Sequence, residues 1–159
     1  MTTTHRNETS IEADPNLPTI VITREFDAPP ERVFRAHTDP ELVIQWLGPR
    51  RLTMHIDHFD ARTGGSYRYV HTDDDGEYRF YGSFHEVRPS ERIVQTFTFE
   101  GFPDGVSLET AHFEDLGGRT RLTTTSVVDS IETRDAIIAS GMETGVREGY
   151  EQLDELLAD

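Results

Sequence analysis

Six segments rich in aromatic and β-branched residues follow one another between residues 52 and 128. Turn signals such as Gly64-Gly65 and Asp75-Gly76 separate them, and most segments alternate apolar and polar residues, as strands with one buried face do. An earlier segment, TIVITREF at residues 19–26, has the same character. The sequence therefore predicts an antiparallel sheet of about seven strands, the last six being LTMHIDHFDA, SYRYVHT, YRFYGSFHEV, RIVQTFTFE, VSLETAHFE and TRLTTTSVV.

Helices are predicted on either side of the six later strands. Proline favours the first helical position, so Pro30 is placed to begin a short helix that ends near residue 37. Thr38 or Asp39 can cap a second short helix, which stops before Gly48-Pro49. Ser130 can cap a final helix that runs to about residue 157. The polar residues 1–17 are predicted to be a disordered leader, which leaves residues 18–159 as one domain.

The order of these elements predicts an α+β helix-grip fold. A curved antiparallel sheet hides its concave face only if another element lies across it. The long C-terminal helix is the element available for this role, and the two short helices after the first strand can close one end. Such an arrangement favours an elongated pocket between the helix and the sheet.

Three glycines recur every fourth residue in the segment predicted to form the last helix: Gly141, Gly145 and Gly149. Each glycine inside a helix costs about 1 kcal/mol relative to alanine, so the stripe calls for a compensating role. Two interpretations remain open. The glycines allow another backbone to pack closely, or they form part of a roof over a cavity.

Composition excludes several classes of function. The chain of 159 residues has no cysteine, which removes disulfides, thiolate nucleophiles and zinc–sulfur sites. The net charge is −15 and every basic residue is arginine or histidine, so nucleic acid and anionic membranes are poor partners. No apolar run is long enough to span a bilayer and no signal region precedes the domain, so we expect a cytoplasmic protein.

No metal, cofactor or catalytic site is predicted from the spacing of reactive residues. His55 and His58 lie three apart on a strand and are expected on opposite faces. His112 and Glu114 share a face, but no third ligand accompanies them. An enzyme would instead need several isolated polar residues to converge inside a pocket: Arg24, His55, His85, Glu109 and His112.

The motifs in their order resemble the homologues of the heat-shock-protein-90 ATPase activator, in the START-like (SRPBCC) superfamily. They are ITREFDAPPERVFRAHTDPELVIQWLGP, DARTGGSYRY, EVRPSERIVQTF, ETAHFEDLGGRTRLT and SGMETGVREGYEQLDELL. The resemblance covers residues 19–157 and implies the helix-grip fold. It also implies binding of a hydrophobic small molecule between the long helix and the sheet, since most of the superfamily does this.

We therefore expect a hydrophobic or amphipathic ligand, with no cofactor. Two alternatives stay open: a co-chaperone-like interaction module that binds a chaperone, and a polyketide cyclase-like enzyme. Both a monomer and a homodimer are compatible with the sequence. The residues expected to line the ligand site come from the short-helix end, the sheet and the last helix: Trp46, Met54, Tyr67, Tyr69, Phe80, Phe84, Phe97, His112, Met142, Gly145, Val146 and Gly149.

Overall fold

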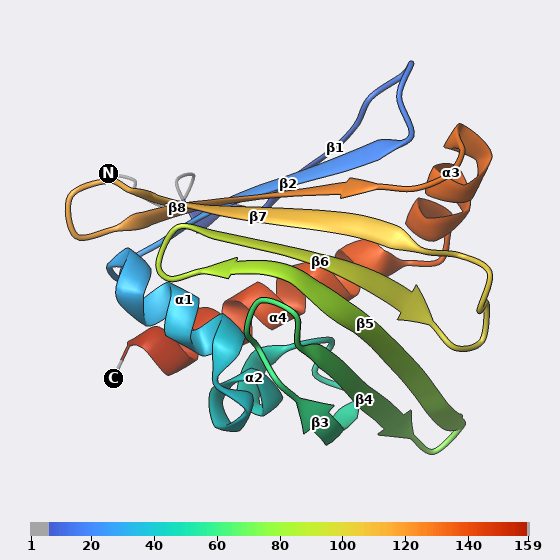
Figure 1. Cartoon of the computed structure of the whole chain (residues 1–159), viewed down its shortest axis with the longest axis horizontal. Coiled ribbons are helices and arrows are strands. Elements are labelled where there is room, and N and C mark those ends of the chain that lie inside the picture. Colours follow the sequence, from blue (N-terminus) through green and yellow to red (C-terminus); the bar gives the residue numbers. More distant parts are fainter. Residues whose placement is uncertain (1–6, 159) are drawn as a thin grey trace.

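A computed structural model of the chain describes residues 7–158. One antiparallel sheet of eight strands carries the fold, in the spatial order β1-β2-β8-β7-β6-β5-β4-β3 (Figure 1). The helix α4 (Met142–Leu157) crosses one face of this sheet. Helices α1 (Pro30–Thr38) and α2 (Pro40–Trp46) lie at one end of the molecule and α3 (Ile131–Ala139) at the other. The predicted α+β helix-grip fold is thus confirmed.

The strands match the predicted segments closely, because alternation in the sequence marks one buried face. In β2, for example, every second residue from Ile20 to Phe26 is buried. The bounds are β1 Ser10–Ala13, β2 Thr19–Phe26, β3 Thr53–Phe59, β4 Ser66–Asp73, β5 Gly76–Arg88, β6 Arg92–Phe99, β7 Ser107–Asp115 and β8 Thr120–Val127.

Strand β1 was not predicted, because its segment was assigned to a disordered leader. That assignment is wrong for residues 10–13, which pair with β2 from Ser10 opposite Thr23 to Ala13 opposite Ile20. Only Ile11 of this strand is half-buried, so the sequence carries no clear alternation. Backbone hydrogen bonds to the free edge of β2 define the strand. Residues 1–6 of the predicted leader lie outside the described part of the chain.

The short helices begin where the capping signals placed them. Helix α1 (Pro30–Thr38) has proline at its first position, and α2 (Pro40–Trp46) is capped by Asp39, whose carboxylate accepts a hydrogen bond from the Glu41 amide at 3.0 Å. Among the two candidate caps, Asp39 is therefore the residue used.

The predicted C-terminal helix is two helices, α3 (Ile131–Ala139) and α4 (Met142–Leu157). The Ser130 hydroxyl caps α3 by accepting a hydrogen bond from the Thr133 amide at 3.0 Å, as expected. Gly141 lies between the helices with φ of 90°, a left-handed conformation that glycine adopts without strain. The prediction of an uninterrupted helix is wrong, and Gly141 marks the break instead of lying inside a helix.

Candidate ligand-binding site

A group of polar side chains lies on the sheet face that α4 covers. In the strand register, Ser126 of β8 lies opposite Glu109 of β7, which lies opposite Gln95 of β6. Ser107 and Thr124 are the next residues of the same faces along β7 and β8. We call these five residues the polar patch. Three adjacent strands bring them together on an inner face whose other residues are mostly apolar, such as Ile93, Phe97 and Phe113.

Glu109 is the ionisable member of the polar patch. Its Oε2 accepts hydrogen bonds from the hydroxyls of Ser107 at 3.3 Å and Ser126 at 3.1 Å. Within residues 7–158, no hydrogen bond reaches Oε1 and no arginine or histidine forms an ion pair with this carboxylate. Burial raises the pKa of Glu109, and the two serine hydroxyls oppose this rise.

Three buried tyrosines, Tyr67, Tyr69 and Tyr150, respond to the negative charge of Glu109. Burial raises the pKa of Tyr150 to about 12, and the negative charge of Glu109 adds to the rise. Burial also raises the pKa values of Tyr67 and Tyr69, again with a contribution from Glu109. The Tyr67 hydroxyl donates to the Thr96 carbonyl at 2.6 Å, whereas the Tyr69 hydroxyl forms no hydrogen bond with a described residue.

An aromatic row borders the polar patch on the β4–β6 side. Tyr67 stacks on Tyr69 at 6.0 Å between ring centroids, Tyr69 on Phe80 at 5.3 Å, and Phe80 on Phe97 at 5.2 Å. Gly82 of β5 makes room for this row, because a Cβ there would fall on the Thr96 carbonyl and the Tyr67 hydroxyl. The row therefore presents a fixed apolar wall.

The helices cover this region incompletely. Ile137 and Ile138 of α3 and Met142 and Val146 of α4 pack against the core but remain half-buried. On the sheet, six inward-facing residues of the same region are half-buried too, while Tyr67, Tyr69, Ser107 and Ser126 beside them are buried. The six are Phe80, Gln95, Phe97, Glu109, Ala111 and Thr124. The strand ends that carry them lie on the side of the sheet where α3 lies (Figure 1). We call this region the half-buried end.

A family model for the "Activator of Hsp90 ATPase homolog 1-like protein" matches residues 27–158. The chain belongs to this family. The match confirms the resemblance found in the sequence motifs and, with the fold, places the domain among START-like (SRPBCC) domains.

Solved structures of bacterial proteins share this fold over nearly the whole chain. A protein from Arthrobacter aurescens is 30% identical, with a TM-score of 0.86, and the match covers 94% of this chain and 91% of that one. Protein Ms6760 from Mycobacterium smegmatis is 27% identical, with a TM-score of 0.85 and coverage of 94% and 97%. A Rhodobacter sphaeroides protein is 29% identical, with a TM-score of 0.84 and the same coverage. No curated protein matches the chain significantly.

The other end of the domain in this family member is filled by side chains, and we call it the packed end. Trp46 donates its indole hydrogen to the Ala36 carbonyl at 2.8 Å and stacks on Tyr150 at 6.0 Å. Leu153 is fully buried. Trp46 therefore joins α1, α2 and α4. The buried apolar residues of this end are Phe26, Val33, Val43, Trp46, Tyr150, Leu153 and Leu157.

The glycine stripe serves the packed end. A Cβ on Gly149 would lie 3.2 Å from the Trp46 carbonyl oxygen, and one on Gly145 would lie 3.4 Å from Pro49 Cδ. Gln152, one turn further, donates to the Gly48 carbonyl at 2.9 Å. The close-packing interpretation therefore holds for Gly149, with the turn after α2 as the neighbour instead of the sheet, and the roof interpretation is wrong there. Gly145 makes only an ordinary contact with Pro49 of the same turn, which does not require a glycine.

The remaining predicted residues divide between the core and the outer surface. Met54 and Phe84 are buried in the core, with Phe84 packed on Tyr67 at 5.3 Å. His112 is exposed, because strand alternation in β7 turns Glu109 and Phe113 inward and His112 outward. The prediction that His112 lines the site is wrong.

Sequence reasoning named Glu109 but missed the four other members of the polar patch. The available signal was the unusual run of serine and threonine at alternating, inward positions of the segments VSLET and TTTSV. Polar residues at such positions indicate an inner face that is not filled by apolar packing alone.

The residues required for an enzyme do not converge. His55, His85 and His112 are all exposed, and only Arg24 and Glu109 face inward. A bulge in β3 places both His55 and His58 opposite outward-facing residues of β4, so the expectation of opposite faces is wrong. Among residues 7–158, no three acidic or histidine side chains are grouped so as to hold a metal ion.

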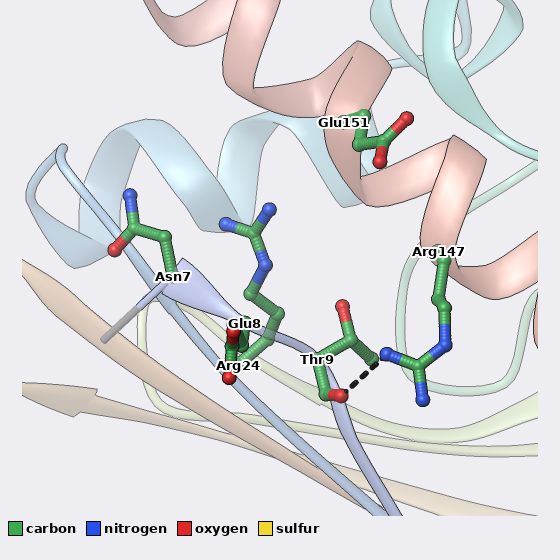
Figure 2. Close-up of a pocket in the computed structure, with 6 residues that line it drawn as sticks. All are labelled: Asn7, Glu8, Thr9, Arg24, Arg147 and Glu151. Atoms are coloured by element: carbon green, nitrogen blue, oxygen red, sulfur yellow. Dashed lines mark hydrogen bonds between the residues drawn. The ribbon is translucent and has the colours of Figure 1, made fainter. Parts of the chain in front are cut away.

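Arg24 lines a pocket at the sheet edge instead of the polar patch. This pocket of about 450 Å³ lies between the start of the described chain, β2 and α4 (Figure 2). The terminal nitrogens of Arg24 bind both Asp154 oxygens, at 2.9 and 2.7 Å, and Arg147 donates to the Thr9 carbonyl at 2.7 Å. A second surface pocket follows β1 and β2 near residues 12–21. None of the predicted ligand-binding residues lines either pocket.

Proposed function

We propose that the domain binds an amphipathic small molecule at the half-buried end, between α3, the first turns of α4 and the inner face of β5–β8. The observation that carries this proposal is the contrast in burial along one inner face. Apolar residues on both sides of this region, such as Met142 and Phe97, remain partly accessible while the packed end is closed.

The chemistry of the region supports an amphipathic ligand. The aromatic row and the apolar residues of α3 and α4 can bury a hydrocarbon body, at about 25 cal/mol per Å² of apolar surface. The polar patch can orient a polar group, since a few convergent polar side chains in an apolar setting are typical of ligand sites. Predicted contacts that fit this region are Tyr67, Tyr69, Phe80, Phe97, Met142 and Val146.

The other two functions stay predictions. No described feature of the fold identifies a chaperone-binding surface. An enzyme would have to rely on Glu109 alone, because the histidines named with it lie on the outer surface. Of the helices in residues 7–158, none combines the length and apolar character needed to cross a bilayer.

The proposal is tested by titrating the protein with n-decanol and following methyl resonances by NMR. We expect saturable shifts at Ala111, Ile137, Ile138 and Met142. The variant Ala111→Phe places a large side chain on the inner face and should block decanol binding. Thr110→Phe introduces the same residue on the outer face of the same strand and should leave binding intact. Shifts confined to the outer surface, or equal binding by both variants, would contradict the proposal.

A further inference from the structure

The Glu109 carboxylate has hydrogen-bond donors on one side only. Both serine hydroxyls bind Oε2, and Oε1 receives no donor from residues 7–158. The two serine hydroxyls are the donors that residues 7–158 direct at this carboxylate, and the tyrosines whose pKa values its charge raises, Tyr67, Tyr69 and Tyr150, carry no positive charge. A carboxylate in such surroundings lacks a counter-charge, which is unfavourable away from water.

The inward-facing cation Arg24 does not fill this role. Its guanidinium binds Asp154 with both terminal nitrogens and donates to the Glu25 carbonyl at 2.9 Å. It lies on β2, and β8 separates that strand from β7. Residues 7–158 thus supply a charged partner for Arg24 and no cationic partner for Glu109.

We propose that the ligand is an amphipathic amine, whose protonated nitrogen donates a hydrogen bond to Oε1 of Glu109 while its hydrocarbon part lies against the aromatic row. This inference rests on the proposed function and specifies the polar group of the ligand. An ammonium group supplies both the donor and the positive charge that Glu109 lacks.

Two further features of the molecule favour a cationic ligand. Tyrosine and phenylalanine rings attract cations to their faces, and the aromatic row presents four such rings beside the polar patch. The net charge of −15 attracts cationic amphiphiles and repels anionic ones such as fatty acids.

The test compares three probes with the same chain length: n-decylamine, n-decanol and decanoate. Calorimetric titrations at 0.15 M salt limit attraction by distant surface charges. We expect wild-type protein to bind decylamine about tenfold tighter than decanol, as a hydrogen bond between charged partners allows, with decanoate weakest. Glu109→Gln should make the Kd values of decylamine and decanol equal within about twofold.

Glu114→Gln is the matched control, since it removes one negative charge from the outer face of the same strand and should retain the preference for the amine. Nuclear Overhauser contacts from the first methylene of decylamine to Tyr69 and Ser126 in the wild-type protein provide a measurement that needs no variant. Contacts to these two residues would support the proposed orientation, and contacts elsewhere would overturn it.

Each result separates the two proposals. Equal affinity of wild-type protein for all three probes would overturn the amine inference and leave the proposed function standing. A preference for the amine that survives in Glu109→Gln would also overturn it, because surface charge would then explain the selectivity. Failure of every probe to bind would overturn the proposed function itself.

Discussion

The two ends of the region between α4 and the sheet are built from the same helix and the same sheet, yet they are packed differently. At the packed end, Trp46, Tyr150 and Leu153 pack with α1 and α2, and Gly149 of α4 lets the turn after α2 approach the helix backbone. At the half-buried end, α3 and the start of α4 face polar side chains and a row of aromatic rings. This contrast is the basis for the proposal that the packed end stabilises the fold while the half-buried end receives a ligand.

The test of this comparison with the largest expected effect replaces one apolar side chain at each end. Leu153→Ala should lower the free energy of unfolding by about 3 kcal/mol, because this fully buried side chain leaves a cavity. Met142→Ala should lower it by about 1 kcal/mol or less, because Met142 is half-buried. Urea unfolding of both variants measures the difference. Equal losses would mean that the two ends are packed alike.

Acid should destabilise both ends, through His37 at the packed end and through His71 of β4, which packs on Tyr69 and Phe80 of the aromatic row. Burial lowers the pKa of His37, which packs on Trp46 at 4.8 Å, to about 4, and burial likewise lowers the pKa of His71 to about 4. The unfolded chain binds these protons near pH 6.5, so its protonation precedes that of the folded state as the pH falls. Stability is therefore complete above about pH 6.5 and is lost progressively down to about pH 4.

We expect each histidine to contribute roughly 1–3 kcal/mol to this loss. The measurement is a series of urea unfolding curves between pH 7 and pH 4, combined with NMR titration of both imidazoles. Titration of either ring near pH 6.5 in the folded protein would contradict the expectation for that residue.

The smallest expected effect distinguishes two glycines of the same helix. Gly145→Ala should raise stability by about 0.5–1 kcal/mol, because alanine favours the helix and its Cβ makes an ordinary contact with Pro49. Gly149→Ala gains the same propensity but presses on the Trp46 carbonyl, so its net effect should be a loss of about 1 kcal/mol. Thermal unfolding of the two variants measures the difference. A gain in stability for Gly149→Ala would show that the turn after α2 shifts at little cost.

The sequence was sufficient to predict most of the fold. Alternation located seven of the eight strands, and the signals at Pro30, Asp39 and Ser130 located three helix starts. Strand β1 was not predicted, because backbone pairing defines it and its side chains bury little surface. The break at Gly141 was not predicted, because a glycine inside a helix and a glycine at its end look the same in a sequence. Only the backbone conformation distinguishes them.

The candidate site was harder to predict, for a geometric reason. Which residues face inward depends on register and bulges, so His112 was misplaced, whereas Tyr67 and Tyr69 were correctly placed on the inner face. The polar patch assembles Gln95, Glu109 and Ser126 from three strands through cross-strand pairing. No local motif in the sequence encodes that assembly.

The chain contains a single tryptophan, and its position has a practical consequence. Trp46 lies at the packed end, where its indole is hydrogen-bonded and stacked. The intrinsic fluorescence of Trp46 therefore reports unfolding and does not respond to changes near α3. A tryptophan introduced at Phe97 would provide a second reporter, and the two signals could then be read separately.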